Sequence, residues 1–367
     1  MLSKIKHFFI GFDLVLIIAF IVLLAIGIIE QYSAAHGNLR PWAYRHIVVA
    51  IIFIPLFLLI VFIPNSKIQS SSYSVYIISL LALIYLALFG SQIMGASRWI
   101  KFKYFNIQPS EICKIAIIMA LARYFNSLNS YAINKYYYMV WAIILALFPT
   151  LLIFLQPNFG TCAIIIFITT ILFFASGIAL KHLFTMFFAA LGMLPIIWYI
   201  LHDYQKKRVL SFFNPTRDPL GSSYNAIQSQ IAIGSGGLWG KGFLHGSQSQ
   251  LDFLPEKQTD FIFTILLEEF GMFGGILFII CYCIIISRIA KIANQSDIMF
   301  NRLVAIGIAA MLFVHMFINI GMVIGILPVV GVPLPLVSYG GSSLLGSLLS
   351  LALLININKY NKGVISK

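Results

Sequence analysis

Charge is the scarcest property of this 367-residue chain. Only 10% of its residues are charged, with 11 acidic against 24 basic residues, whereas 60% are hydrophobic and the mean hydropathy is +0.97. Soluble globular domains carry about 25% charged residues and do not need so much apolar surface. The composition therefore excludes a soluble protein and predicts an integral membrane protein.

Cysteine is also scarce. Because Cys281 and Cys283 are two residues apart, they face different ways on a helix. We expect the cysteines to fill core space rather than to form disulfides or a metal site. The chain also lacks a Ser-His-Asp arrangement and metal-ligand spacing, so no cofactor is indicated, and the use of a divalent cation stays open. All four cysteines lie inside apolar segments: Cys113, Cys162, Cys281 and Cys283.

Long polar stretches are rare, and apolar runs fill most of the chain. A helix that crosses a bilayer needs about 20 apolar residues. With no internal repeat, linker or second domain, we expect an all-α polytopic membrane protein with a single membrane domain, 1–367. The fourth run is the weakest because Glu111 and Lys114 interrupt it. The ten runs are 12–33, 43–63, 73–92, 108–125, 138–156, 160–178, 182–201, 259–287, 302–325 and 338–357.

Lysine and arginine are unevenly divided between the two sides that these spans define. The termini and the short loops on their side hold twelve basic residues, whereas the short loops of the other side hold five. Basic residues favour the cytoplasmic side of a membrane. We therefore expect both termini in the cytoplasm and the long loop 202–258 outside.

The expected outer side nevertheless carries many cations. One interpretation is a set of solvated residues, because long loops cross the membrane regardless of charge. The other is a binding surface for an anionic head group, such as a pyrophosphate, at the outer leaflet. Nucleic acid is a poor partner, because the basic residues are scattered between membrane segments. The outer cations are Arg98, Lys101, Lys103, Lys206, Lys207, Arg208, Arg217, Lys241 and Lys257.

Within the loop 202–258, Tyr224, Ile227 and Ile231 repeat at helical spacing. This spacing predicts an amphipathic helix that lies in the membrane interface. The glycine-rich stretch 234–242 follows, but it is not a nucleotide-binding loop, because Ser235 and Gly242 occupy positions that the motif reserves for glycine and for serine or threonine. We expect flexible backbone near the head groups, with N–H groups able to cradle a phosphate.

Several polar residues fall inside the apolar runs. Glu111 and Lys114 are three apart, so a structural ion pair is one reading and a contact of Lys114 with a substrate phosphate is the other. His315 and Asn319 are four apart; hydrogen bonds between helices explain them adequately, and a proton pathway is the other reading. Two further carboxylates, Glu268 and Glu269, lie too far along their helix to share a proton with Asp260.

Asp260 is the most informative residue, because it stands where the long polar loop gives way to a strongly apolar helix. In one reading Thr259 caps the helix and Asp260 simply complements the positive end of the helix dipole. In the other reading Asp260 has a chemical role, because carboxylates are seldom kept near hydrocarbon without a partner or a function.

Motifs along nearly the whole chain decide between these readings. The chain resembles the SEDS family (shape, elongation, division and sporulation), and within it the RodA-like branch. The segments that carry the resemblance are Gly95-Ala-Ser-Arg-Trp-Ile100, Gln108-Pro-Ser-Glu111 with Lys114, Gln156-Pro-Asn-Phe-Gly-Thr161, Asp218-Pro-Leu-Gly-Ser-Ser-Tyr224, 228–242, 248–263 and Pro333-Leu-Pro-Leu-Val-Ser-Tyr-Gly-Gly-Ser-Ser343.

Two positions depart from the family pattern. Asn158 stands where the family usually has aspartate, and Gln258 stands where it usually has histidine. The first departure argues against a required carboxylate at position 158. The second removes a titratable neighbour of Asp260 and argues against a histidine-assisted mechanism.

The resemblance implies a peptidoglycan glycosyltransferase of the cytoplasmic (inner) membrane. Such an enzyme polymerises lipid II, a disaccharide-pentapeptide on undecaprenyl pyrophosphate, into glycan strands on the outer face. The expected partner is a class B penicillin-binding protein, a transpeptidase of the cell-elongation machinery. The family's essential aspartate matches Asp260.

The expected chemistry follows from this match. Asp260 would act as the general base for the acceptor hydroxyl, and the N-terminus of its helix would lower its pKa. Two alternatives stay open: a transporter (flippase) of the lipid-linked precursor, which intramembrane carboxylates would suit, and a non-catalytic scaffold. The cations expected to stabilise the departing pyrophosphate are Lys114, Arg98, Lys101, Arg208, Arg217 and Lys257.

Overall fold

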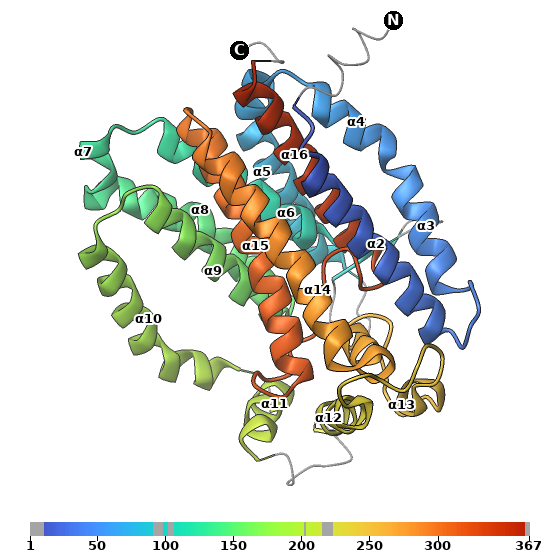
Figure 1. The fold of residues 1–367 in the computed structure, drawn as a ribbon. Helices are drawn as coiled ribbons and strands as arrows, with labels where there is room; N and C mark the ends of the chain where they lie inside the picture. Colours follow the sequence, from blue (N-terminus) through green and yellow to red (C-terminus); the bar gives the residue numbers. More distant parts are fainter. Residues whose placement is uncertain (1–10, 91–97, 102–105, 202, 215–222, 364–367) are drawn as a thin grey trace, which may run out of the picture.

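The computed structural model of this chain describes residues 11–90, 98–101, 106–201, 203–214 and 223–363. Long helices run roughly side by side in a bundle (Figure 1). Helix α2 begins and α16 ends at the same end of the bundle, where Asn358 Nδ2 donates to Gly11 O at 2.7 Å. We call this the terminal end and the opposite one the loop end.

Each of the ten predicted spans corresponds to a helix or a pair of helices. Eight are long and apolar enough to cross a membrane; Phe159–Ala175 is shorter, and Pro109–Asn126 carries Glu111, Lys114 and Arg123. The all-α polytopic membrane fold is therefore confirmed. The spans are α2 (Leu14–Ala34), α3 (Trp42–Ile52) with α4 (Ile54–Phe62), α5 (Asn65–Phe89), α6 (Pro109–Asn126), α8 (Tyr136–Leu155), α9 (Phe159–Ala175), α10 (Leu180–Ile200), α14 (Ile262–Asn294), α15 (Met299–Val323) and α16 (Gly341–Asn361).

Two helices form the centre of the bundle, and one lies at its edge. In the most apolar stretch of each helix, 72% of the residues of α15 and 83% of those of α16 are buried, whereas none of those of α10 are. α10 lies at the margin of the bundle and contacts α9 (Figure 1). Because lipid solvates apolar side chains as well as protein does, an exposed face on α10 is compatible with a membrane span.

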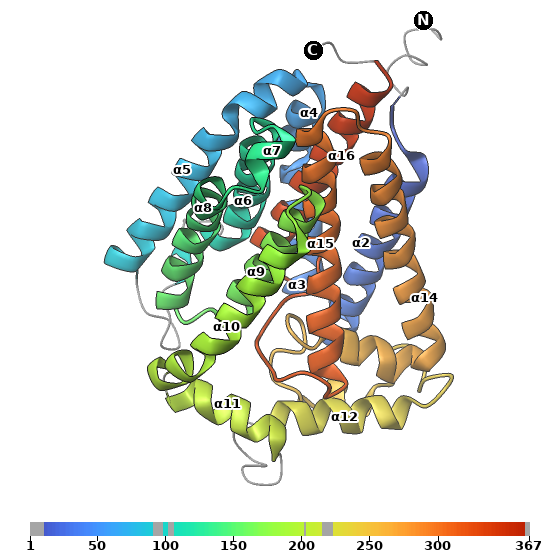
Figure 2. The same cartoon turned by 90° about the vertical axis from the view of Figure 1, so that its left-hand side faces the viewer.

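The loop end is built from short elements, of which the sequence predicted only the helix that contains Tyr224, Ile227 and Ile231. A two-residue antiparallel pair, β1 (Ile100–Lys101) and β2 (Asn106–Ile107), precedes α6. The long loop folds into α11 (Asp203–Phe213), α12 (Tyr224–Gly236) and α13 (Ser247–Gln250), which lie across the loop end (Figures 1 and 2). The short α7 (Ser130–Ile133) lies between α6 and α8.

The predicted helix in the long loop is present as α12. It packs against α14 through the small buried residues Ser229, Ala232 and Gly236, while Ile231 is 48% exposed. The glycine-rich stretch 234–242 is not free backbone, because Lys241 N and Gly242 N donate to carbonyl groups of α14 at 3.0 Å. These two N–H groups are therefore unavailable to a phosphate.

The expected single span 259–287 is wrong in its limits, because α14 is broken at Gly271. The backbone there has φ 64° and ψ −165°, and Met272 N donates to Gly237 O at 3.0 Å. A side chain at 271 would collide with the backbone of Gly240 and Leu238. The first part of α14 therefore lies at the loop end and carries Glu268 and Glu269, whereas the part after Gly271 crosses the bundle (Figure 2).

Candidate active site at the loop end

Asp260 lies in a turn that precedes α14. The carbonyl of Glu256 accepts hydrogen bonds from Thr259 N at 3.1 Å and Asp260 N at 3.2 Å, and Glu256 itself is left-handed with φ 54°. Because this turn continues to Phe261, the helix begins only at Ile262 with Phe261 as its N-cap. The expectation that Thr259 caps the helix and that Asp260 sits in its first turn is therefore wrong.

The electrostatic surroundings of Asp260 also differ from the expectation. Burial, followed by the nearby carboxylate of Glu256, raises the pKa of Asp260 to about 6, while Arg208 and Arg98 act in the opposite direction. The predicted lowering of this pKa by a helix N-terminus is wrong, because Asp260 lies outside the helix. At pH 7 a group with this pKa is still roughly nine-tenths ionised, yet it is a stronger base than an ordinary aspartate.

The two arginines that act electrostatically on Asp260 come from different parts of the chain. Arg98 precedes β1, and its guanidinium donates to Gln156 O at 3.1 Å and to Pro157 O, at the α8–α9 turn. Arg208 is an exposed residue of α11, and its Nη1 lies 3.5 Å from Val329 O. Both were predicted from sequence as anion-binding candidates, and the structure places both in the electrostatic field of Asp260.

The connection between α15 and α16, residues 324–340 and hereafter the α15–α16 segment, forms the other wall of the site. Gly331 adopts φ +69°, and a Cβ atom built on it would lie 3.1 Å from Asp260 Oδ2. The backbone therefore approaches the carboxylate to a distance that a larger residue would disturb. Sequence reasoning did not find Gly331, because nothing near it in the chain signals a contact 71 positions away.

Lys257, another predicted anion-binding residue, is bonded to groups of the long loop. Its buried ammonium group donates to Ser249 O and to Asp252 Oδ1, the latter at 2.6 Å. The hydrogen bond from Lys257 holds the pKa of Asp252 below its usual value. Among the other predicted cations, the side chain of Lys101 and all of Arg217 lie outside the described part of the structure.

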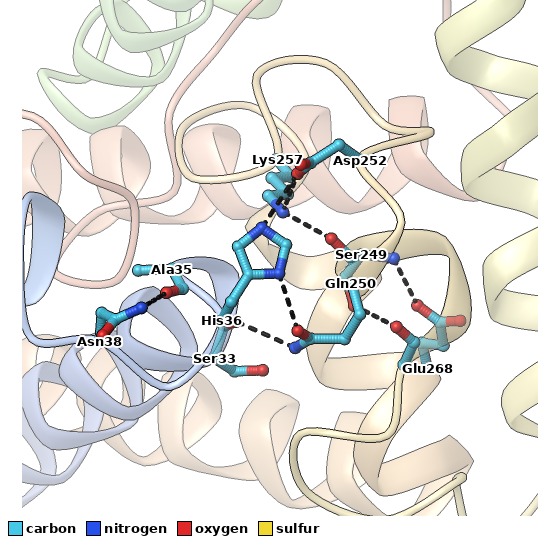
Figure 3. Close-up of polar contacts among 10 residues, drawn as sticks. Ser33, Ala35, His36, Asn38, Ser249, Gln250, Asp252, Lys257 and Glu268 are labelled. Carbon is cyan, nitrogen blue, oxygen red and sulfur yellow. Dashed lines mark hydrogen bonds and ion pairs between the residues drawn. The ribbon is translucent and has the colours of Figure 1, made fainter.

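The Lys257–Asp252 pair belongs to a network that fastens the long loop to the end of α2 (Figure 3). His36 lies between Gln250 Oε1, at 2.9 Å from Nδ1, and Asp252 Oδ1, at 3.3 Å from Nε2. Gln250 Nε2 in turn donates to Ser33 O at 3.1 Å. These contacts indicate that Lys257 holds the loop in place.

Glu268 closes the same region from α14. Its carboxylate accepts from Lys241 Nζ at 2.8 Å, from Gln248 N at 2.9 Å and from Ser249 N at 3.3 Å. A fully buried carboxylate needs such donors, because unpaired burial of a charge is costly. Glu268 is therefore an anchor for the loop around α13 (Figure 3).

Glu111 and Lys114 form the ion pair that their spacing predicts, and the pair extends to a third residue. Lys114 Nζ lies 2.9 Å from Glu111 Oε1 and 2.6 Å from His315 Nε2, with all three side chains buried. Because an ammonium group only donates, His315 Nε2 accepts, and Nδ1–H then donates to Pro333 O at 3.1 Å. The pair thus supports the α15–α16 segment from inside the bundle.

The fold and the site together define a class: a polytopic helical membrane protein with an aspartate and two nearby arginines at one end of its bundle. Residues 6–363 match the family model FtsW/RodA/SpoVE, described as cell cycle protein. The chain belongs to this family, as the motifs indicated.

Curated relatives agree with the family model. The chain is 43% identical over 294 residues to the peptidoglycan glycosyltransferase MrdB of Escherichia coli K12, covering 78% of this chain and 77% of that protein. It is 31% identical to the peptidoglycan glycosyltransferase RodA of Treponema pallidum, covering 95% and 97% of the two chains.

Solved structures share the fold over almost its full length. One match is to a chain from a peptidoglycan synthase complex, described as coordinating polymerization and crosslinking, with a TM-score of 0.83, 28% identity and coverage of 95% and 98%. Another is to RodA of Thermus thermophilus, with a TM-score of 0.70, 26% identity and coverage of 95% and 97%. The arrangement of helices is therefore that of the family.

Proposed function

We propose that this peptidoglycan glycosyltransferase polymerises lipid II into glycan strands, with Asp260 as the general base. The observation that carries the proposal is the position of Asp260. Burial and Glu256 raise the pKa of Asp260 to about 6, and Arg98 and Arg208 act on it from two different elements. A carboxylate with a raised pKa beside cations suits a reaction that removes a proton and releases an anion.

In the proposed reaction Asp260 accepts the proton of the acceptor sugar 4-hydroxyl. The hydroxyl oxygen attacks the anomeric carbon of the donor, and the bond from that carbon to the pyrophosphate oxygen breaks with inversion. General bases of this kind contribute about 10²–10⁴ in rate, and efficiency improves as the pKa of the base approaches the working pH. The raised pKa of Asp260 therefore favours proton transfer near neutrality.

Arg208 and Arg98 supply positive charge for the leaving pyrophosphate. Arg208 lies on the surface of α11 and can approach a phosphate from the solvent side, whereas Arg98 is held by the carbonyls of Gln156 and Pro157. A cation held in place as Arg98 is stabilises charge as it develops, because it need not reorganise during the reaction.

The proposed location follows from the distribution of basic residues. We assign the terminal end to the cytoplasm and the loop end, with Asp260, to the outer face, because the loops and termini of the terminal end hold more lysine and arginine. The proposed partner is a class B penicillin-binding protein of the elongation machinery. Support for the partner comes from the related synthase complex, whose description joins polymerization to crosslinking.

The alternative of a lipid flippase gains no support from two of the acidic residues that first suggested it. Glu268 is anchored by Lys241, Gln248 and Ser249 at the loop end, and Glu111 is paired with Lys114. These carboxylates stabilise the structure where they are. The test below supplies lipid II directly to detergent-solubilised protein, so that polymer formation does not depend on transport.

The test compares wild type with Asp260→Asn in gel-resolved polymerisation of labelled lipid II, with and without the partner. Asp297→Asn is the matched control, because Asp297 is an exposed residue of the connection between α14 and α15. This connection lies at the terminal end (Figure 1). We expect long glycan from wild type and from Asp297→Asn, and none from Asp260→Asn. Normal polymerisation by Asp260→Asn would refute the assignment of the base.

A further inference from the structure

The motif Pro333–Ser343 has no chemical role in the proposed reaction, although it lies beside Asp260. The serine and tyrosine side chains of this motif carry no charge that the reaction uses. Its hydrogen bonds suggest a different role. They join the α15–α16 segment and the end of α15 to the turn that carries Asp260, over sequence separations of 59 to 81 residues. The bonded residues are Tyr339 and Gln258, 81 apart in the chain, Ser338 and Thr259, 79 apart, and Asn319 and Asp260, 59 apart.

Three consecutive carbonyl groups of the Asp260 turn are held in this way. Tyr339 N donates to Gln258 O at 2.9 Å, and Ser338 Oγ donates to Thr259 O at 2.5 Å. Asn319, from α15, donates to Asp260 O at 2.9 Å. Because successive peptide planes are fixed, the direction in which the Asp260 side chain leaves the backbone is fixed as well.

The α15–α16 segment can serve as a support only if it is rigid itself, and the structure shows how it is held. Side chains from four helices bind its carbonyl groups in succession, and every one of these side chains is buried. The bonds are Asn319 to Val332 O at 2.7 Å, His315 to Pro333 O at 3.1 Å, Tyr282 to Pro335 O at 2.6 Å, His46 to Leu336 O at 3.1 Å and Gln31 to Val337 O at 2.8 Å.

Ser338 is the residue where the two halves of this arrangement meet. Its hydroxyl accepts from Leu334 N at 2.7 Å and donates to Thr259 O, so it closes a turn within the segment and clamps the Asp260 turn with the same atom. The side chain is 2% exposed. Among the hydrogen bonds of the described residues, Ser338 Oγ is the one hydroxyl oxygen that bonds both Leu334 N and Thr259 O.

We propose that Ser338 is a positioning residue that aims Asp260 at the acceptor hydroxyl. It acts together with Asn319 and the backbone N–H of Tyr339, and it contacts no reacting atom. This proposal rests on the proposed role of Asp260 as the base. It also gives the motif Pro333–Ser343 a physical role, because hydrogen bonds of the motif connect the Asp260 turn to the rigid core of the bundle.

The test measures kcat and KM of lipid II polymerisation for Ser338→Ala, Ser338→Cys and Ser338→Thr in the full-length protein. Ser347→Ala is the matched control, because Ser347 is a buried serine of α16 whose hydroxyl donates to Ser343 O at 2.9 Å and has no bond to the Asp260 turn. The unfolding temperature of each purified variant is measured alongside, so that rates are compared between folded proteins.

We expect Ser338→Ala to lower kcat by about 10- to 100-fold, because small errors in aiming a reacting group have effects of this size. The KM should change by less than about 2-fold, since substrate contacts are untouched. Ser338→Thr restores the donor and should recover most of the rate. Ser338→Cys, whose thiol donates weakly, should lie between the two. The order of the rates would then follow donor strength rather than side-chain size.

Three results would overturn the proposal: a kcat for Ser338→Ala equal to that of Ser347→Ala, a loss that appears only in KM, or rates that follow the unfolding temperatures. If Ser338→Thr does not fold, the comparison of alanine with cysteine still decides the outcome. Asp260→Asn is run in parallel. An active Asp260→Asn would refute the base itself, whereas an inactive Asp260→Asn with a fully active Ser338→Ala would refute only the positioning role.

Discussion

Two acidic sites in this protein, one buried and one half-buried, place a carboxylate in opposite surroundings. In the middle of the bundle, Glu111 bonds Lys114 at 2.9 Å, and His315 completes the group at 2.6 Å from the same ammonium. At the loop end, Asp260 is subject to the like charge of Glu256 and to the opposite charges of Arg98 and Arg208. The first site neutralises its charge locally, and the second leaves its carboxylate able to take up a proton.

The difference teaches how to separate support from chemistry among the polar residues of a membrane protein. Glu111, Glu268 and Lys257 each have short, specific partners and hold elements together. Asp260 instead has a firmly held backbone, and burial disfavours the charge of its carboxylate. Removing the charge of a supporting residue should therefore damage the fold, whereas removing the charge of Asp260 should damage the reaction.

The largest expected effect is that of Asp260→Asn, the change that separates rate from stability most sharply. We expect the rate to fall by about 10²–10⁴. The unfolding temperature should stay the same or rise, because burial of the ionised carboxylate opposes folding at neutral pH. Thermal unfolding of the purified variant, followed beside the polymerisation assay, checks both parts. A clear fall in unfolding temperature would place Asp260 with the supporting residues.

The next effect is expected from Lys114→Met. It leaves Glu111 buried without its partner, which costs about 3–5 kcal/mol and should reduce the yield of folded protein. The double variant Glu111→Gln with Lys114→Met removes both charges and should recover much of that loss. Size-exclusion profiles and unfolding temperatures measure the effect. If Lys114→Met folded normally and lost activity alone, Lys114 would contact substrate instead.

A smaller effect is expected from Gly331→Ala, which tests the close approach of the Gly331 backbone to the Asp260 carboxylate. The new methyl group would lie 3.1 Å from Asp260 Oδ2, and φ +69° is strained for alanine by about 1–2 kcal/mol. We expect a loss of rate of about 10-fold. Gly177→Ala is the control, because Gly177 also has a positive φ, +90°, with nothing within 4 Å of an added Cβ. An equal loss of rate in the two variants would show that the loss comes from backbone strain and not from contact with the Asp260 carboxylate.

The smallest effect is expected from Arg208→Ala, because this side chain is exposed and its charge is screened by solvent. We expect a fall in kcat/KM of several-fold, about 3- to 10-fold, that becomes smaller as ionic strength rises. Lys207→Ala, an exposed neighbour on α11, should change little. Equal effects of both variants would indicate a general surface charge rather than a phosphate contact.

Much of the fold was predictable from the sequence, because the bilayer imposes a simple length rule. Apolar runs of about 20 residues predicted ten spans, and each corresponds to a helix or a pair of helices, eight of which are long and apolar enough to cross a membrane. The spacing of Glu111 and Lys114 predicted their ion pair. Asp260 was found from its place at the boundary between loop and helix. These features depend on residues that are near one another in the chain.

The features that were missed depend on contacts between distant residues. The break at Gly271 exists because the backbone of 237–240 pairs with it, and no local pattern announces that pairing. The pKa of Asp260 was predicted in the wrong direction, because a left-handed Glu256 prolongs the turn and delays the start of α14. Gly331 and Ser338 became visible only when the α15–α16 segment was seen against the Asp260 turn.

The pH dependence of kcat/KM tests the account most directly, measured for wild type and for Glu256→Gln. The pKa of Asp260 is raised to about 6 by burial and by Glu256, so activity should be full above pH 7 and fall as the pH drops through about 6. Glu256→Gln removes one of the two causes, and the acidic limb should move to lower pH. An acidic limb near 4 in wild type, or one that Glu256→Gln leaves in place, would contradict the assignment of Asp260 as the base.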